Sequence, residues 1–224
     1  MKLSELVYLS VKNAIYYDDF SFTREEFLNR TFDNSPDYAT NINNVFTPIN
    51  EAIARLSDLE RIPYQVEECA ISSGVIHLNN LPSKKIVKEV INVAEVNNSG
   101  AYHKLSHRLF GVGKVFVLDY FNSFNKIYIE YKEDIPTFNI DHIPFKDFND
   151  TLVTSNDYEL RDFGITDSMC NYIIEYASGR LLEQMNADLS NMHIIRAEQY
   201  FTNIKPVSQA FVQQVVSRVY GVGE

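Results

Sequence analysis

The range 37–61 carries one continuous stripe of apolar residues, at alternating gaps of four and three, which is the spacing of a buried face on an α-helix. Asparagines and charged residues fill many of the other positions, so the opposite face is expected to be exposed to solvent. Pro63 marks the helix end, because proline disfavours helical conformation in the preceding residue. Pro48 lies inside the stripe and costs about 3 kcal/mol in a helix interior. We therefore expect a kink near Val45 or a new start capped by Thr47. The stripe comprises Tyr38, Ile42, Val45, Ile49, Ala52, Leu56 and Leu59.

Helical periodicity also occurs ahead of this segment. Apolar positions from Leu3 onward predict a helix over about 4–17. Thr23 and Glu26 have the spacing of a capping box, in which each side chain satisfies a backbone donor at the helix start. This pair predicts a short helix that ends near Thr31.

Three more helical segments are predicted near the C-terminus. Thr166 is a suitable N-cap, and Asp167 is favourable at the positive end of the helix dipole. Within that helix, Gly179 is expected to permit close approach of a neighbouring helix. The ranges 191–204 and 207–220 continue the helical pattern. In the first of these, the expected apolar face consists of Ile194, Ile195, Ala197, Tyr200 and Phe201.

Between the two helical regions the apolar periodicity changes from 3.6 to about 2, which is typical of strands. Residues 101–114 show weak periodicity and are expected to form a loop, whereas 134–150 reads as extended or irregular chain. A turn at 72–74 would join the first two strands as a hairpin, and a turn at 121–125 would join the last two. The expected strands are 64–71, 75–78, 86–96, 115–120 and 126–131.

Helices followed by a block of strands and then by helices indicate an α+β fold with segregated layers. The N- and C-terminal helices are expected to form a bundle, and the central β block is expected to be mostly antiparallel. The corresponding segments are 1–61 for the first bundle helices, 62–150 for the β-rich insertion, 151–204 for the later bundle helices, and 205–224 for a final helix and tail.

The composition narrows the possible functions. The chain has 224 residues, 45% of them hydrophobic, with a net charge of −10 and a pI of about 5.0, which disfavours non-specific adhesion to nucleic acid or anionic membrane. Two cysteines, Cys69 and Cys170, are too few for a disulfide scaffold, so a reducing compartment is expected. Lys2, Glu5 and Lys12 interrupt the N-terminal apolar pattern, which is wrong for a signal peptide, and no apolar run is long enough to span a membrane.

Two short patterns partly match known ligand sites. His103 and His107 are four residues apart, as zinc ligands on one helix face are, but Lys104 replaces the general-base glutamate and no third ligand is suggested nearby. Gly111 to Lys114 has the glycines and lysine of a phosphate-binding loop, but Val115 stands where a hydroxyl residue would hold magnesium. A loop with two histidines and a glycine turn leading into a strand are the expected alternatives.

A third pattern is that of a metal-dependent nuclease. Asp119 ends one strand, and Glu130 and Lys132 lie on the next, as in the Asp…Glu-x-Lys site where two carboxylates hold a metal and the lysine assists attack on phosphate. Side chains alternate along a strand, so Glu130 and Lys132 would share a face. The alternative is a polar outer face that includes Tyr128, with Ile129 pointing inward.

Several segments together resemble a known family over about residues 37–201. The segments are INEAIARL (49–56) running into IPYQV (62–66), IYIEY (127–131) ahead of IP (135–136), YIIEYAS (172–178) and AEQYF (197–201). Their order and pattern resemble the head-to-tail connector, or adaptor, proteins of short-tailed bacteriophages, of the tail tubular protein A kind, and the ring proteins of crAss-like phages.

This resemblance implies a structural protein of the virion, made in the host cytoplasm, with no catalytic residues, metal or cofactor. Family members form a twelve-fold ring between the portal protein and the tail or further ring proteins, and they line a channel through which double-stranded DNA passes without specific binding. No membrane contact is implied. The C-terminal segment would reach the portal, with an interface formed by Phe211, Val212, Val215, Val219 and Tyr220. The nuclease and an unassigned soluble interaction domain remain the alternatives.

Overall fold

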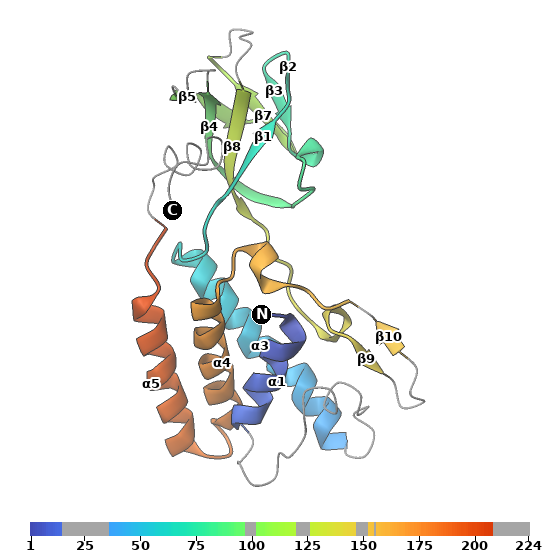
Figure 1. Ribbon diagram of the computed structural model, residues 1–224, viewed down its shortest axis with the longest axis vertical. Helices are drawn as coiled ribbons and strands as arrows, with labels where there is room; N and C mark the ends of the chain where they lie inside the picture. Colours follow the sequence, from blue (N-terminus) through green and yellow to red (C-terminus); the bar gives the residue numbers. More distant parts are fainter. Residues whose placement is uncertain (15–35, 97–101, 120–125, 147–151, 155, 208–224) are drawn as a thin grey trace. The chain divides into compact units, whose positions relative to one another are not determined.

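A computed structural model describes residues 1–14, 36–96, 102–119, 126–146, 152–154 and 156–207 (Figure 1). The chain divides into two compact units. The helical unit consists of Met1–Ile62 and Pro136–Pro206, and the β unit contains Pro63–Ile135. Helices combined with antiparallel sheets confirm the α+β class. The β unit ends at Ile135, so residues 136–150 group with the helices, although the sequence placed them in the β-rich insertion.

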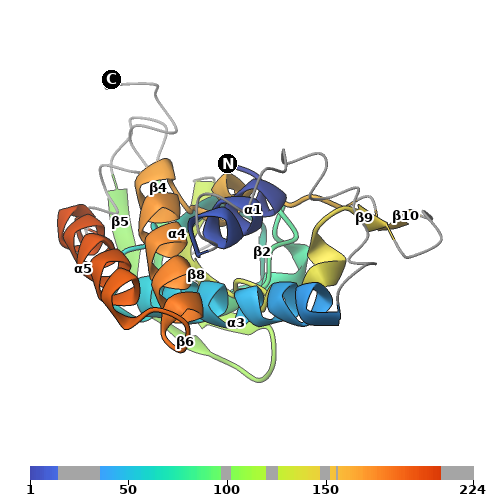
Figure 2. The same cartoon turned by 90° about the horizontal axis from the view of Figure 1, so that it is seen from below.

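The helical unit is built around α4 (Asp167–Leu182), which packs against α1 (Leu3–Ala14), α3 (Pro36–Asp58) and α5 (Ala187–Asn203). The view from below shows α4 between α5 and α1 (Figure 2). The predicted helices at 4–17 and 37–61 are therefore confirmed where they are described, and the short helix predicted at 24–31 lies outside the described residues. The interior of this unit includes Leu6, Val7, Val11, Ile49, Ala52, Leu56, Tyr172, Ile173 and Ala177.

The α3 helix is continuous through Pro48, so a new start at Thr47 is wrong. Ile49 and Leu56, both fully buried, continue the apolar stripe beyond the proline, and their burial offsets the lost backbone hydrogen bond. Asn50 adds a polar attachment: its side chain donates to the carbonyl of Phe138 at 2.8 Å and accepts from the amide of Phe138 at 2.9 Å. Asn50, which the sequence placed on the solvent-exposed face, thus attaches α3 to the segment around Phe138.

Gly179 allows α4 and α5 to approach closely, as the sequence predicted. A Cβ atom on Gly179 would lie 2.7 Å from Cδ1 and 2.8 Å from Cγ1 of Ile194. In the space that the glycine leaves, the hydroxyl of Ser190 donates to the carbonyl of Gly179 at 2.9 Å. The missing side chain therefore permits both an apolar contact and a buried hydrogen bond between the helices.

The buried face of α5 differs from the predicted one. Ile195 and Tyr200 were expected to be buried, but their exposed fractions are 59% and 40%. The helix begins at Ala187, four residues earlier than predicted, with Asn186 as its N-cap. Because Gly179 brings the helices together, small and polar side chains can occupy the contact. The buried residues of α5 are Ser190, His193, Ala197 and Phe201.

Two guanidinium groups lie close to the ring of Phe201 at the end of α5. The guanidinium carbon of Arg55 lies 4.4 Å from the ring centroid, and that of Arg61 lies 5.0 Å from it. Arg55 also forms two hydrogen bonds to the carboxylate of Glu198, and Arg61 donates to the carbonyl of Ile204. Planar guanidinium groups can stack and hydrogen-bond at the same time, so these contacts join α3 to the edge helix.

The β unit contains two antiparallel four-stranded sheets among its described residues. The first has the order β1-β8-β4-β5, with β1 (Gln65–Cys69), β8 (Lys126–Glu133), β4 (Val87–Val96) and β5 (Tyr102–Leu105). The second has the order β2-β3-β7-β6, with β2 (Ile71–Ser72), β3 (Val75–His77), β7 (Lys114–Val117) and β6 (His107–Leu109). Outside these sheets, the helical unit holds the pair β9 (Phe145–Lys146) and β10 (Leu152–Thr154), and short 3₁₀ turns occur at η1 (Leu78–Asn80), η2 (Ile140–His142) and η3 (Leu160–Phe163).

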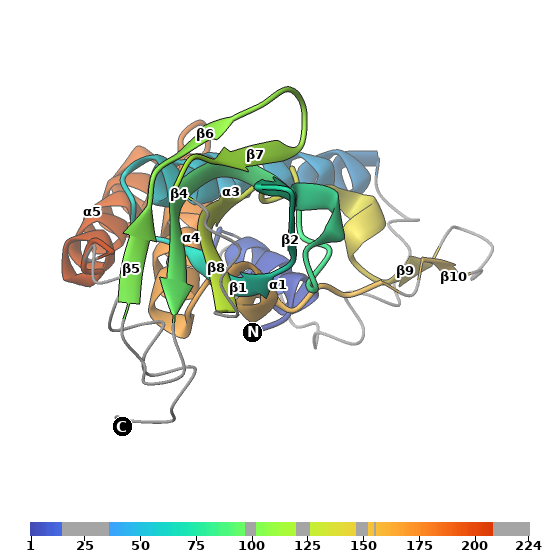
Figure 3. The ribbon, with the colours of Figure 1, turned by 90° about the horizontal axis from the view of Figure 1, so that it is seen from above.

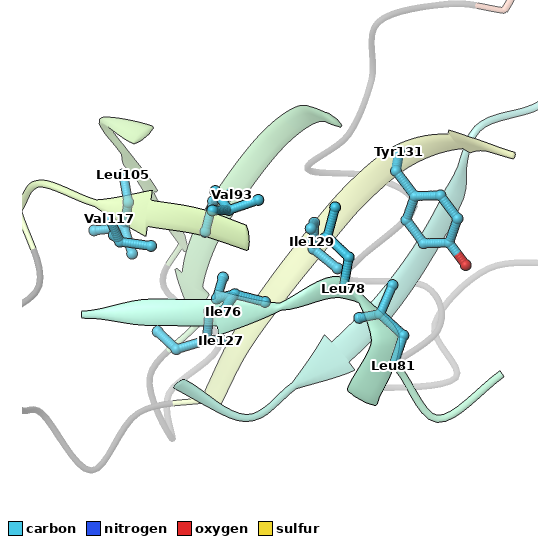
Figure 4. Packing of buried hydrophobic residues seen from close by; sticks show 10 residues of the cluster. Ile76, Leu78, Leu81, Val93, Leu105, Val117, Ile127, Ile129 and Tyr131 are labelled. Carbon is cyan, nitrogen blue, oxygen red and sulfur yellow. The ribbon is translucent and has the colours of Figure 1, made fainter. Parts of the chain in front are cut away.

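Side chains from both sheets meet in one apolar core (Figure 4). Alternate residues of β8, including Ile127, Ile129 and Tyr131, point into this core, as expected for a strand with one face inward. The second sheet contributes Ile76 from β3 and Val117 from β7. The two sheets therefore pack through their apolar faces, which consist of alternate residues along the strands.

Two predictions about the β unit were wrong. Residues 101–114 were expected to be a loop, but they contain β5 and β6. The strand predicted at 64–71 is divided, so that β1 and β2 belong to different sheets. β7 and β8 belong to different sheets, and the turn predicted to join them at 121–125 lies outside the described residues. The β2–β3 hairpin is confirmed, and its turn residues Ser73 and Gly74 have φ angles of 51° and 77°, as a two-residue turn of this kind requires.

Replacing Gly179→Ala is expected to destabilise the protein by about 1–3 kcal/mol, the usual cost of inserting a methyl group into a packed contact. The higher helix propensity of alanine, about 1 kcal/mol, offsets part of this loss. Urea denaturation of the variant provides the measurement. As a control, Ile194→Ala removes both atoms that the new Cβ would strike, so adding Gly179→Ala to that background should cost much less. Equal losses in both backgrounds would contradict the contact described here.

Candidate functional site

The two histidines with the spacing of zinc ligands lie on strands. His103 is in β5 and His107 is in β6, so they belong to different sheets and do not share a helix face. Nδ1 of His107 lies 3.4 Å from the carbonyl oxygen of Leu105. In the described part of the chain, no group of three or more His, Cys, Asp or Glu side chains could hold a metal ion. The spacing of the histidines therefore does not produce the ligand geometry for which it was considered.

The glycine pair that partly matches a phosphate-binding loop forms the turn between β6 and β7. The amide of Phe110 donates to the carbonyl of Lys114 at 2.9 Å, which closes the turn. Gly111 and Gly113 have φ angles of 66° and 73°, a conformation that glycine adopts without strain. A phosphate loop leads into a helix whose N-terminus faces the anion, whereas this turn leads into a strand. The alternative of a glycine turn before a strand is confirmed.

The proposed nuclease residues are distributed over both sheets. Asp119 follows β7 and accepts a hydrogen bond from the amide of Ser106 at 3.2 Å. The hydroxyl and amide of Ser106 hold the pKa of the Asp119 carboxyl below its usual value. Glu130 lies on β8, and β7 and β8 are not neighbours in either sheet. Lys132 lies 3.5 Å from a carboxylate oxygen of Glu89. Asp119 and Lys132 thus interact with Ser106 and Glu89, which are not part of the Asp…Glu-x-Lys pattern.

The face of β8 that carries Glu130 is more buried than the sequence indicated. Glu130 and Lys132 do share the face of Tyr128, opposite the inward isoleucines. However, Glu130 is only 2% exposed and Tyr128 only 7%. Tyr128 belongs to a second apolar cluster with Val66, Ala94 and Val96. Burial raises the pKa of the Glu130 carboxyl, whose oxygen accepts a hydrogen bond from Asn92. A metal-binding carboxylate must be ionised, and burial opposes that state.

Neither cysteine has the environment of a reactive thiol. Burial raises the pKa of Cys69 to about 12 and that of Cys170 to about 11. The thiolate is the reactive form, so both groups are held in the unreactive state near neutral pH. Their positions in the sheet and in α4 indicate packing roles.

Three exposed apolar residues of the β unit adjoin one another at the β6–β7 turn. Leu109, Phe110 and Val112, which we name the apolar tip, have exposed fractions of 62%, 61% and 100%. Figure 3 shows the β6–β7 connection as a loop that extends past the ends of both strands. Exposed Arg108 and Lys114 flank the tip. Adjoining exposed apolar side chains mark candidate interaction sites, so this turn is the candidate functional surface of the β unit.

Sequence reasoning missed this surface because it treated 101–114 as a loop without strands. Its signal was present as Leu-Phe-Gly-Val-Gly, in which apolar residues stand beside turn-forming glycines. The interface predicted from the sequence, comprising Phe211, Val212, Val215, Val219 and Tyr220, lies outside the described residues together with the helix predicted at 207–220.

Comparison of the chain with protein-family models and with curated proteins finds no match. Among the described helices, none is both long and apolar enough to cross a membrane.

Replacing Glu130→Gln is expected to stabilise the protein by about 1 kcal/mol near neutral pH, because glutamine can keep the hydrogen bond from Asn92 without a buried charge. The pKa of Glu130 lies above its ordinary value of 4.5, so its protonated form stabilises the fold below that value. This contribution is lost as the pH rises through the folded-state pKa. The advantage of the variant should therefore shrink toward about pH 4.

Urea midpoints of wild-type protein and variant across this pH range provide the measurement. Glu68→Gln is the matched control, because Glu68 is half exposed and pairs with Lys126 at 2.8 Å. That substitution should change stability by less than about 1 kcal/mol. A Glu130→Gln variant that is less stable than wild type by the same amount at both ends of the range would contradict the burial of the carboxyl.

Proposed function

We propose that this protein is a structural component of a bacteriophage virion that forms a ring between the portal and the tail. The proposal begins from the resemblance of residues 37–201 to head-to-tail connector proteins. The α+β architecture supports it, since a helical unit interrupted by a compact β unit is the organisation that the resemblance implies. In this role the chain acts through its surfaces and catalyses no reaction.

The distribution of charge is the observation that carries the proposal. The helical unit contains 21 Asp and Glu against 11 Lys and Arg, a net charge of −10. Residues 63–135 contain 8 of each, so their net charge is zero. The net charge of the whole chain is therefore that of its helical unit. A ring whose lumen is lined by this unit would repel phosphates and release no counterions to DNA, so DNA could pass without being held.

The nuclease alternative has weaker support. The two acidic candidates do not lie on neighbouring strands: Asp119 follows β7 of one sheet, and Glu130 lies on β8 of the other. Burial of Glu130 further disfavours the ionised carboxylate that a metal would require. An interaction domain of another kind would share the surfaces described here, and the partner would distinguish it from a connector.

Co-expression with the portal protein encoded in the same genome tests the proposal. We expect the two proteins to co-purify, and negative-stain images to show an additional ring beneath the portal with the portal's twelve-fold symmetry. Portal protein expressed alone is the control for density at that position. Assembled particles that lack this chain, or a chain that cleaves DNA with magnesium and loses that activity on Glu130→Ala, would contradict the connector role.

The C-terminal segment is proposed to reach the portal. Deleting residues 207–224 should leave the helical unit folded, because the interior residues of α1, α3, α4 and α5 all precede the deletion. The urea midpoint of the truncated chain should therefore match that of the full chain, and its circular dichroism spectrum should lose only the helical signal of the predicted 207–220 segment. Incorporation into portal complexes should fall about tenfold, as expected when an apolar anchor is lost. Normal incorporation of the truncated chain would contradict this role.

A further inference from the structure

The edge helix α5 has a second, exposed face directly opposite the one that it buries. Successive helical residues are about 100° apart, so Asp188, Met192, Ile195 and Gln199 fall on one side and Ser190, His193, Ala197 and Phe201 fall on the other. The second set packs inward. In the first set, which we name the outer face of α5, Ile195 is 59% exposed and Met192 is 36% exposed. An apolar centre on an exposed helix face is a candidate contact surface.

The apolar tip of the β unit is held in a fixed conformation. The amide of Leu78 donates to the carbonyl of Gly113 at 2.8 Å, in addition to the hydrogen bond between Phe110 and Lys114 that closes the turn. The guanidinium of Arg108 lies 5.9 Å from the ring centroid of Phe116 on the neighbouring strand. A preorganised loop loses little conformational entropy on binding, which favours its use as an anchor.

The charges around the two surfaces are complementary. Residues 102–118 contain Lys104, Arg108 and Lys114 and no Asp or Glu, in a chain whose net charge is −10. The outer face of α5 begins at Asp188, and exposed Arg196 lies beside Ile195, so the negative charge is that of the helical unit as a whole. Cationic residues around an apolar tip therefore match an apolar patch on an acidic unit.

We propose that the apolar tip of one copy of this chain packs on the outer face of α5 of a second copy. Each copy has one of each surface, so the contact is heterologous and can repeat from copy to copy. The inference rests on the proposed ring function in one respect, namely that a ring would use this contact. The contact itself would also assemble the purified chain without a portal. A fully exposed valine at the centre of the tip favours a protein surface over DNA, because phosphates are bound by cations and polar groups.

Photo-cross-linking of the full chain tests the contact directly. Val112 is replaced by p-benzoyl-phenylalanine, and the protein is mixed with an isotope-labelled copy that lacks the cross-linker. We expect mixed-isotope cross-links to peptides that contain Met192 or Ile195, with a lower yield at high salt because screening weakens the attraction between the charged surfaces. Cross-links that join two copies only through other surfaces, or none at concentrations of about 1 mM, would overturn the proposal.

Surface variants test the same contact by sedimentation velocity. Phe110→Ser with Val112→Ser, and separately Ile195→Lys, should each weaken self-association about tenfold, the effect of losing a central anchor. Ile86→Ser in the β unit and Leu59→Ser in the helical unit are matched controls, because these residues are 68% and 51% exposed and lie outside both surfaces. The controls should associate as wild type does. Association unchanged in the surface variants would overturn the proposal.

A mixture of the two variants distinguishes this contact from other modes of assembly. The Ile195→Lys copy keeps its tip, and the double serine copy keeps its α5 face, so together they should form pairs and nothing larger. A mixture that forms no pairs, or that grows into long assemblies, would overturn the heterologous contact. A lipid-binding role for the tip would also overturn the proposal. Its signs would be that wild-type protein binds anionic vesicles, that the double serine variant does not bind them, and that no cross-links form between copies.

The connector role and this contact can fail separately. If the double serine variant forms normal rings on the portal, the proposed contact is wrong and the connector role stands. If the cross-link to α5 forms but assembled particles lack the chain, the contact stands and the connector role is wrong.

Discussion

Burial of α4 on nearly all sides is the constraint on which the helical unit depends. Its buried residues include the consecutive runs Tyr172–Ile174 and Ala177–Gly179, which cannot lie on one stripe of a helix. The described helices α1, α3 and α5 all pack on the surface of α4, so each of them buries only part of its own surface there. Ser178 fits this environment because its hydroxyl has acceptors on two helices. The hydroxyl oxygen lies 2.7 Å from the carbonyl oxygen of Ile174 in α4 and 3.1 Å from that of Ser10 in α1. One consequence is that α5, at the edge, keeps a whole face exposed.

Local periodicity predicted the helices well and the sheets poorly, for a physical reason. A stripe of six apolar positions within one helix, as in α3, is a long-range signal carried by one segment. Leu59, the seventh position of the predicted stripe, lies beyond the helix and is 51% exposed. Strands as short as β6, with three residues, carry almost no such signal. Which strands pair is also decided by residues far apart in the chain, as when β8 lies between β1 and β4. The division of the 64–71 segment at Ala70 therefore could not be inferred from its own apolar pattern.

The candidate surface was hard to predict for a related reason. Leu109, Phe110 and Val112 have the composition of core residues, and only the geometry of the β6–β7 turn places them outside. Glu130 shows the reverse case: a carboxylate on the polar side of a strand is buried beside Tyr128. In both cases burial is set by what the neighbouring elements cover, which the residue type alone does not determine.

Electrostatics links the two proposals. Copies that each carry −10 repel one another, and a ring of such copies concentrates that repulsion. In the proposed contact, attraction between a cationic hairpin and an acidic helical unit would offset part of this repulsion at each junction and would orient the approaching copy. Salt screens both effects beyond about 10 Å, whereas the apolar contact at the centre is insensitive to ionic strength. The charges would then set how quickly and in which orientation copies meet, while Phe110, Val112 and Ile195 would determine how long they stay together.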